Sequence, residues 1–352
     1  MAFAKFKLME FPRFVLIGHN VIEQTGELVE RLGWDRRALV VCDERTLDIA
    51  GKTAASWLSR SGFHTEFVSI KGANMESVEA VKQIAFRSKA DFLIGAGGGS
   101  VIDVTKLSAY ELERPYISMP TSAAHDGIAS GRASIKETQG NVSKTAKPPD
   151  AIIADSALIL KAPYRMLASG CGDMMANLVA VKDWELAHKQ KGEEFSTFAA
   201  SLSVNSAQLV IENRNIIKPN SEAAVWLVVK SLISSGVAMS IAGDSRPASG
   251  SEHMFSHMLD RLVPGGAMHG EQCGVGSILM MKLHGGDWEQ IRDTLKAIRA
   301  PIDAKGLNIP SEKIIEALMG AHKIRPDRYT VLGDKGLTRA KAEKLAKETG
   351  VV

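Results

Sequence analysis

The chain has 352 residues, of which 45% are hydrophobic, and its formal net charge is +3 at pH 7. This length and composition exclude a small peptide and are typical of a globular protein with room for two hydrophobic cores. The charge is only mildly basic and lacks the concentrated lysine and arginine run of a nucleic-acid binder, so we expect no nucleic-acid partner.

The first 120 residues alternate short β-branched runs with longer helical patterns. This alternation is typical of βαβ units and a parallel sheet. Apolar residues at helical spacing predict the crossover helices that parallel strands require. The predicted strands cover residues 14–17, 38–42, 65–69, 92–94 and 117–119, and the predicted helices cover residues 21–32, 47–61 and 76–88.

The next part of the chain is polar over residues 134–149 and ends in a proline pair, which predicts a hairpin or a long loop. A further strand is predicted at residues 151–154. The remaining patterns are helical, and Ser311 and Thr338 are residue types that cap helix starts. These helices are predicted at residues 199–213, 223–242, 251–262, 288–298, 311–323 and 338–348.

The pattern therefore changes from alternating to helical near residue 160. We predict an α/β protein in which a Rossmann-like parallel-sheet domain, residues 1–160, is followed by an all-α domain, residues 161–352. The first domain would bind a dinucleotide, and the second would bind a metal and the substrate. The active site is expected in the cleft between them, because ligand sites favour domain interfaces.

The most informative segment is residues 91–106, where an apolar run ends in glycines and turns at once into an apparent helix. Such a turn presents bare backbone N–H groups to a phosphate. A side chain at Gly97, Gly98 or Gly99 would hold a dinucleotide pyrophosphate away from the backbone, and glycine also tolerates unusual φ values there. The alternative is an ordinary tight turn, since the pattern is not the usual G-x-G-x-x-G.

Polar residues also follow two other predicted strands. Thr121 and Ser122 come after the fifth strand and can hydrogen-bond a nucleotide, while Asp126 can hold a substrate hydroxyl. Turn chemistry alone would also favour Ser, Asp and Gly in this segment. Asp43 follows the second strand, where it is either an acceptor for the adenosine ribose or a solvated turn residue.

A candidate metal site follows from His253 and His257, which are four residues apart in a predicted helix and share one face. Two glycines then let the chain return with His269 toward the same cavity. Asp173 is the best third ligand, because it lies in a glycine-rich entry to an apolar helix, where an unpaired carboxylate is costly to bury. The alternatives are a chance histidine pair and a simple N-cap role for Asp173.

Three cysteines, Cys42, Cys171 and Cys273, stand far apart in the sequence. Their odd number and spacing suggest neither a disulfide framework nor a cysteine-based zinc site, which fits a reducing compartment. No apolar run approaches the ~18 residues of a membrane span, and the N-terminus lacks an export signal. We therefore expect a cytoplasmic protein without a membrane span.

The glycine turn, the polar segment after the fifth strand and the candidate metal ligands occur in an order that resembles the glycerol dehydrogenase and iron-type alcohol dehydrogenase superfamily. The resemblance covers essentially the full length of the chain. Residues 245–253 and 324–330 look closest to the superfamily's sn-glycerol-1-phosphate dehydrogenase family. The resemblance implies that NAD or NADP is held by Gly97, Gly98, Gly99, Ser100, Val101, Thr121, Ser122, Ala123, Ala124 and Ser130. It also implies one zinc ion per subunit on Asp173, His253 and His269, and substrate contacts from Asp126, Asp173 and His257.

The activity implied by this resemblance is the reversible, zinc-dependent reduction of dihydroxyacetone phosphate to sn-glycerol 1-phosphate with NADH or NADPH. In the family this product supplies the backbone of archaeal membrane phospholipids, and a homo-oligomer is expected. His257 would orient the substrate or relay a proton with a near-neutral pKa, or would only pack behind the metal. The candidates for holding the substrate phosphate are Lys106, Arg165, Arg246 and Arg328, and the sequence does not choose among them.

Three other functions stay open from the sequence. A dehydrogenase of free glycerol would need no phosphate site. A cyclase similar to 3-dehydroquinate synthase would use NAD and a metal without net redox change. The third possibility is a non-catalytic nucleotide-binding protein, but such a function would give no reason for Asp173, His253 and His269 to converge.

Overall fold

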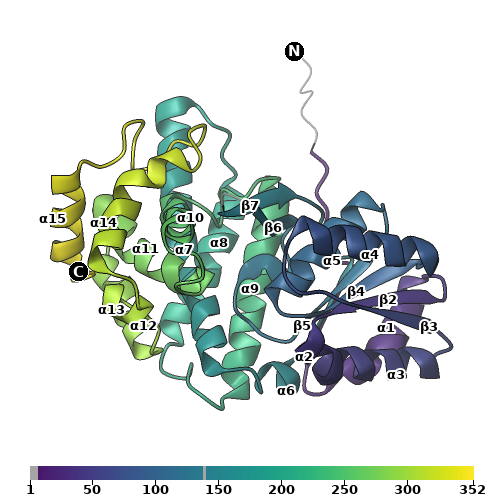
Figure 1. Cartoon of the computed structure of the whole chain (residues 1–352). Helices are drawn as coiled ribbons and strands as arrows, with labels where there is room; N and C mark the ends of the chain where they lie inside the picture. Colours follow the sequence, from purple (N-terminus) through teal and green to yellow (C-terminus); the bar gives the residue numbers. More distant parts are fainter. Residues whose placement is uncertain (1–6, 138–139) are drawn as a thin grey trace.

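The structure is a computed structural model that describes residues 7–137 and 140–352 (Figure 1). A lobe built on a parallel sheet lies beside a lobe built of helices, so the predicted fold class is confirmed. A boundary after residue 160 falls between α6 (Ser156–Ile159) and α7 (Tyr164–Lys191). The core of the helical lobe also takes in Ile102 and Ile152 from the N-terminal half, so the two-domain division stays a prediction.

The sheet has six parallel strands in the order β1-β8-β5-β4-β2-β3. Each predicted strand is confirmed, with small extensions at its ends. β4, β5 and β8 are buried at every position, which accounts for their continuous apolar runs. The strands are β1 (Phe14–Gly18), β2 (Arg37–Cys42), β3 (His64–Ser69), β4 (Phe92–Gly97), β5 (Tyr116–Pro120) and β8 (Ala151–Asp155).

Helices cover both faces of this sheet. One face packs against η1 (Val21–Gln24), α1 (Thr25–Leu32) and α3 (Lys52–Arg60), with α2 (Glu44–Thr46) and η2 (Leu47–Gly51) leading into α3. The other face packs against α4 (Met75–Arg87) and α5 (Gly99–Glu111). The connections after β2 and β4 therefore run to opposite sides, and the crevice outside the carboxyl ends of these two strands is where such sheets bind ligands.

After β5 the chain makes the short turn η3 (Asp126–Ile128) and then the hairpin β6 (Arg132–Glu137) and β7 (Gly140–Thr145). The hairpin predicted for residues 134–149 is thus confirmed, although its connecting residues 138–139 lie outside the described part. Asn141 Nδ2 donates to Asp260 Oδ2 at 3.1 Å. This bond joins the hairpin to the helical lobe.

The helical lobe confirms the predicted helices to within about a turn at each end. Thr338 caps its helix, since its Oγ1 accepts from Lys341 N at 3.4 Å. The cap predicted at Ser311 is wrong, because Pro310 precedes the helix and Ser311 is its first residue. The further helices are α8 (Thr197–Glu212), α9 (Glu222–Ala242), α10 (Ser251–Leu262), α11 (His269–Leu283), α12 (Trp288–Ala297), α13 (Ala304–Leu307), α14 (Ser311–Gly320), η4 (Ala321–Lys323) and α15 (Arg339–Thr349).

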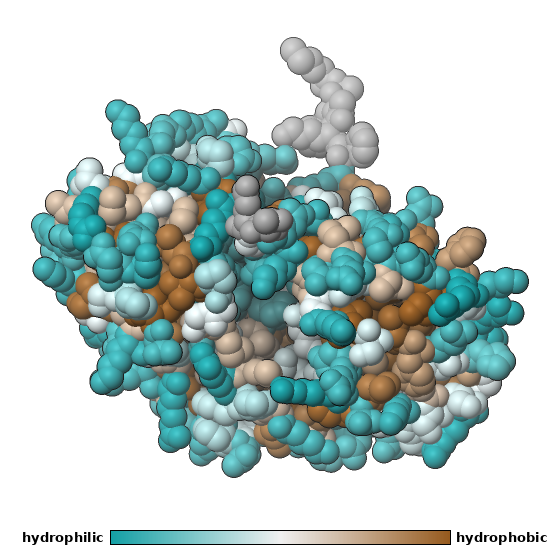
Figure 2. All heavy atoms as spheres, viewed as in Figure 1, coloured by the Kyte–Doolittle hydropathy of each residue, from teal (hydrophilic) through white to brown (hydrophobic). Residues whose placement is uncertain are grey.

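Most of the face seen in Figure 2 is hydrophilic, and it is hollowed where the two lobes meet. One helix, α9, is long and apolar enough to cross a membrane by length and composition alone. Inside the structure, 61% of its apolar window is buried, as in the core helix of a globular protein.

Candidate active site

The predicted nucleotide residues gather in a pocket at the carboxyl ends of β2 and β4. Met268 and His269 of the helical lobe also line this pocket. Thr121 follows β5, where its N–H donates to Gly97 O at 3.0 Å, and Ala123 is buried. The predicted residues that line it are Asp43, Gly98, Gly99, Ser100, Val101, Ser122 and Ala124.

Two of the three glycines of this turn, Gly97 and Gly99, leave no room for a Cβ. A Cβ on Gly97 would lie 2.6 Å from Val101 Cβ, and one on Gly99 would lie 1.9 Å from His125 Nε2. The tolerance of glycine for unusual φ values is not used in this turn, because positive φ occurs at other glycines of the described chain and not at Gly97, Gly98 or Gly99. The backbone runs directly from strand into α5, whose first N–H groups are free for a phosphate.

Asp43 serves the protein structure as well as facing the pocket. Its Oδ1 accepts from Arg45 N at 2.9 Å and from Thr46 N at 2.8 Å, which caps α2. Asp43 is therefore a structural turn residue that also lines the pocket. Its contact with a ribose stays a prediction.

Asp173, His253 and His269 come from α7, α10 and α11 and meet at one point. Asp173 Oδ1 lies 3.7 Å from His253 Nε2 and 3.8 Å from His269 Nε2. Asp173 is in the interior of α7, which begins at Tyr164, so neither the helix entry predicted there nor the alternative N-cap role is correct. In the interior of the helix the backbone N–H groups are already bonded to backbone oxygens, so Asp173 has none to cap. Its carboxylate is directed to the histidines instead.

Cys273 joins this group, and reasoning from the sequence missed it. Its Sγ lies 3.6 Å from His269 Nε2, and the four candidate ligand atoms lie within 4.8 Å of one another. The available signal was its spacing of four residues from His269. That signal needed α11, a helix that is buried over most of its length and was not predicted.

A second set of hydrogen bonds orients the three predicted ligands. His253 Nδ1 lies 2.8 Å from Glu252 Oε1, and His269 Nδ1 lies 3.2 Å from Ser256 Oγ. Asp173 Oδ2 accepts from the backbone N of Asp126 at 2.9 Å. The two imidazole Nε2 atoms and one carboxylate oxygen are left to face each other, as in metal sites whose ligands are held from behind.

The electrostatics of this group also fit a divalent cation. Burial raises the pKa of Asp173 to about 7, although the N–H of Asp126 opposes the shift. Burial lowers the pKa values of His253 and His269, so both imidazoles are neutral. A cation would favour the charged carboxylate and would use the neutral nitrogens as ligands. The donor set, a carboxylate and two imidazoles, suits zinc.

Small residues let the helices approach closely enough to form this group. A Cβ on Gly172 would lie 2.2 Å from Gly270 O, and one on Gly270 would lie 2.0 Å from Ser169 O. These glycines neighbour Asp173 and His269 directly. The close contact of α7 with α11 is therefore what brings the two ligands within reach of one ion.

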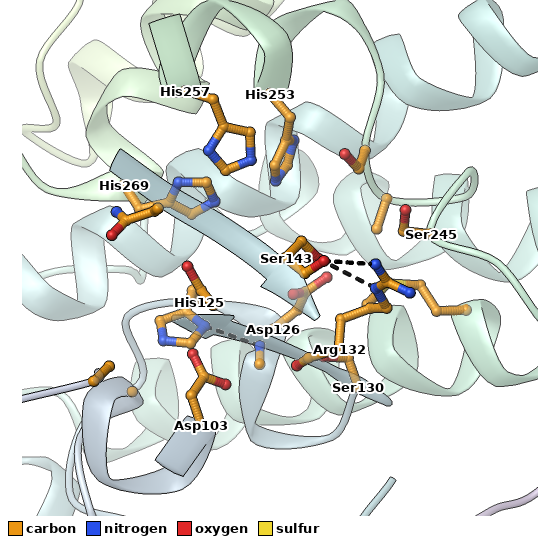
Figure 3. A pocket seen from close by; sticks show the side chains of 18 of the residues that line it. Asp103, His125, Asp126, Ser130, Arg132, Ser143, Ser245, His253, His257 and His269 are labelled. Atoms are coloured by element: carbon orange, nitrogen blue, oxygen red, sulfur yellow. Dashed lines mark hydrogen bonds between the residues drawn. The ribbon is translucent and has the colours of Figure 1, made fainter. Parts of the chain in front are cut away.

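A second cavity adjoins the metal group (Figure 3). It shares Gly99, Ser100, His125 and His269 with the nucleotide pocket, so the two spaces are contiguous. Ser130, predicted to contact the dinucleotide, lines this second cavity and not the pocket at Asp43. The other polar residues that line this second cavity include Asp103, Asp126, Arg132, Ser143, Ser245, His253, His257 and Arg325.

Asp126 and His257 both face this cavity, as expected for substrate contacts. Asp126 Oδ2 accepts from Ser235 Oγ at 2.9 Å, and burial together with Asp173 raises its pKa to about 7. The near-neutral pKa expected for His257 is wrong, since burial and neighbouring positive charges lower it to about 3. Its Nδ1 is buried and has no hydrogen-bond partner in the described chain.

His125 is a further site residue that the sequence did not single out. Its Nδ1 accepts from Gly127 N at 2.9 Å, so the neutral ring carries its proton on Nε2, beside Gly99. Burial lowers its pKa to about 4, which keeps the ring neutral. A single histidine in a turn carries no pattern that could have identified it.

The four basic residues considered for the substrate phosphate are all engaged elsewhere. Lys106 is fully buried and donates to Asp103, Gly127 O and Arg132 O. Three arginines form ion pairs, which join Arg165 to Glu271, Arg246 to Glu193 and Arg328 to Asp244. Sequence reasoning missed Arg132 and Arg325, which line the cavity itself.

Replacing the carboxylate behind His253 tests the orientation of the metal group. In Glu252→Gln we expect a ~10- to 100-fold loss of zinc affinity, because a neutral amide oxygen is a weaker acceptor than a carboxylate oxygen for the N–H groups of His253 and Gly250 that donate to Oε1. Competition with a chromogenic chelator measures the affinity. The surface variant Glu312→Gln is the control, and equal affinity in the two variants would show that Glu252 plays no part in metal binding.

Comparison with known proteins gives consistent results. The sequence model of the iron-containing alcohol dehydrogenase family matches residues 16–163. The chain is 53% identical over 346 residues to a glycerol-1-phosphate dehydrogenase (NAD(P)+) of Methanosarcina mazei, which covers 98% of this chain and 97% of the relative. It is 52% identical to the protein of the same name from Thermococcus sibiricus, with 98% of both chains covered.

Solved structures show the same fold at low sequence identity. A probable glycerol dehydrogenase from Sinorhizobium meliloti superposes with a TM-score of 0.81 at 19% identity, covering 99% of this chain and 100% of that chain. Glycerol dehydrogenase from Schizosaccharomyces pombe gives 0.79 at 20% identity, covering 99% and 94%. Both agree with a sheet lobe followed by a helical lobe.

Proposed function

We propose that this chain, which belongs to the iron-containing alcohol dehydrogenase superfamily and within it to the glycerol-1-phosphate dehydrogenases, reduces dihydroxyacetone phosphate to sn-glycerol 1-phosphate. The reaction is reversible, draws its hydride from NADH or NADPH, and depends on one zinc ion per subunit. Its product would enter the synthesis of archaeal membrane phospholipids. A cytoplasmic location and a homo-oligomeric state stay predictions from the sequence.

The observation that carries this proposal is the contact between two spaces. The pocket at the glycine turn and the cavity at the metal group share Gly99, Ser100, His125 and His269. A dinucleotide held by its pyrophosphate at the start of α5 can therefore extend its nicotinamide toward a ketone beside Asp173. That proximity is the first requirement for hydride transfer.

The residues of the chain then have separate tasks. Asp173, His253 and His269 would hold zinc, which when bound polarises a ketone oxygen and stabilises negative charge there. Asp126 faces the cavity from η3 and would hold a substrate hydroxyl, while the Ser235 hydroxyl fixes its carboxyl. His257 lines the cavity and would contact the substrate as a neutral imidazole. Burial keeps these polar groups partly desolvated.

The proposal is tested by NADH and NADPH oxidation with dihydroxyacetone phosphate beside dihydroxyacetone, using chelated and zinc-restored protein. We expect turnover of the phosphorylated ketone that is lost on chelation and recovered with zinc. Turnover of dihydroxyacetone alone would instead indicate a dehydrogenase of free glycerol. If zinc-loaded protein consumes no reduced cofactor with either ketone, the cyclase alternative gains support.

A further inference from the structure

We infer that Arg132 and Arg325 bind the phosphate group of the substrate, an inference that rests on the proposed function. The two arginines come from distant parts of the sequence. Arg132 begins β6 of the hairpin, and Arg325 follows η4 near the C-terminal end. Both line the cavity that contains His253, His257 and His269.

The partners of these two guanidinium groups are neutral. Arg132 Nε donates to Ser143 Oγ at 3.1 Å, its Nη1 to Thr145 Oγ1 at 2.7 Å, and its Nη2 to Ser143 O at 2.9 Å. Arg325 Nη1 donates to Ser245 Oγ at 3.3 Å. Across residues 7–137 and 140–352, no carboxylate forms an ion pair with either group, in contrast to Arg165, Arg246 and Arg328.

Two partly buried positive charges facing one cavity repel each other. Burial, and then the charge of Arg132, lowers the pKa of Arg325. Asp244 attracts both arginines, but its carboxylate is already 2.8 Å from Arg328 Nη2. A dianion between the two groups would relieve this repulsion, and planar guanidinium groups match phosphate oxygens in pairs.

The arrangement of the cavity also fits a phosphorylated ketone. Figure 3 shows the three histidines at one end and Arg132, Ser130 and Ser245 at the other. A ketone at the metal end would thus place its phosphate at the arginine end, where Ser130 and Ser245 offer hydroxyl donors. The 2′-phosphate of NADP would lie elsewhere, because Asp43, the predicted ribose contact, lines the other pocket.

The test compares Arg132→Met, Arg325→Met and Arg325→Lys with the wild-type protein. The readout is the ratio of kcat/KM for dihydroxyacetone phosphate to kcat/KM for dihydroxyacetone. We expect each Met variant to lower this ratio by ~100-fold or more, mainly through KM, since a buried charge partner is lost. Arg325→Lys keeps the charge without the planar fork, and we expect an intermediate loss of about 10-fold.

Arg339→Met is the control, because it removes an exposed arginine on α15 that pairs with Glu312 and Glu343. Its ratio should equal that of the wild type. Bound zinc and the unfolding midpoint, measured for every variant, separate a lost contact from a misfolded protein. Competitive inhibition by inorganic phosphate should weaken in the Met variants by a similar factor.

The outcomes distinguish this inference from the proposed function. If the wild type reduces dihydroxyacetone phosphate and both Met variants keep its ratio and its inhibition by phosphate, the assignment of Arg132 and Arg325 is overturned while the function stands. If the wild type with zinc does not reduce this ketone, the proposed function fails. In that case the phosphate site is tested by calorimetry with inorganic phosphate. Phosphate binding that is lost in Arg325→Met supports the site, and binding that persists in this variant overturns it.

Discussion

Asp173→Asn is expected to remove stably bound zinc and to lower kcat by ~1,000-fold or more, because a polarising cation supplies several kcal/mol to the transition state. The carboxylate is the only charged member among the three predicted ligands, since the pKa values of His253 and His269 are lowered by burial. An asparagine oxygen keeps the size and the hydrogen bond from Asp126 N. It offers the ion a dipole in place of a negative charge.

The stability of the metal-free protein distinguishes this effect from misfolding. Burial raises the pKa of Asp173 from 3.8 to about 7. A carboxyl whose pKa is higher in the folded state holds its proton more tightly there, so its unfavourable contribution grows as the pH rises from 3.8 toward 7. Metal-free Asp173→Asn lacks this group and should be at least as stable as metal-free wild type at neutral pH.

Metal content by atomic emission, steady-state kinetics and urea unfolding test this prediction. Asp155→Asn is the matched control, because Asp155 is equally buried and accepts from Ile22 N and Leu158 N far from the cluster. Asp155→Asn should lower the free energy of unfolding and leave the zinc content unchanged. An Asp173→Asn protein that retains both zinc and turnover would remove Asp173 from the ligand set.

Gly172→Ala is expected to lower the free energy of unfolding by about 3 kcal/mol, the upper end for overpacking a tight contact. The new Cβ would lie 2.2 Å from Gly270 O, and the backbone of a second helix cannot rotate away as a side chain can. α7 and α11 must therefore separate. Since Asp173 and His269 are the next residues on these helices, we also expect a zinc affinity at least ~10-fold weaker.

Chemical denaturation of the metal-free protein and chelator competition of the loaded protein measure the two effects separately. Gly51→Ala is the control, because its Cβ would meet ordinary contacts, the nearest 3.5 Å away at Leu47 Cδ1. That variant should keep wild-type stability and affinity. Wild-type values in Gly172→Ala would mean that the spacing of the two helices does not set the metal geometry.

The strands and the separate site residues were predictable because their signals are local. A buried parallel strand is a continuous apolar run, and the turn at Gly97, Gly98 and Gly99 follows β4 within the same segment. The pair of His253 and His257 follows from helical spacing alone. The two glycines before His269 predicted its return toward this pair, and the apolar surroundings of Asp173 made it the best third ligand, a set that the family resemblance then supported.

Other predictions failed where the neighbours of a residue decide its state. The segment around Asp173 looked like a helix start because glycines usually end helices, but Gly170 and Gly172 are there to admit another backbone. The pKa of His257 depends on how deeply α10 is buried and on charges from other elements. Neither quantity is encoded in a short window of sequence.

The parallel-sheet lobe, the glycine turn and the residue types able to bind a metal could all be predicted from the sequence. The contact of Cys273 with His269, the pairing of the four basic candidates and the shared cavity of Arg132 and Arg325 became apparent only from the folded chain. The two groups of features differ in the distance over which they are set. Backbone patterns follow from neighbouring residues, whereas the charge and accessibility of a side chain depend on groups that folding brings from far along the chain.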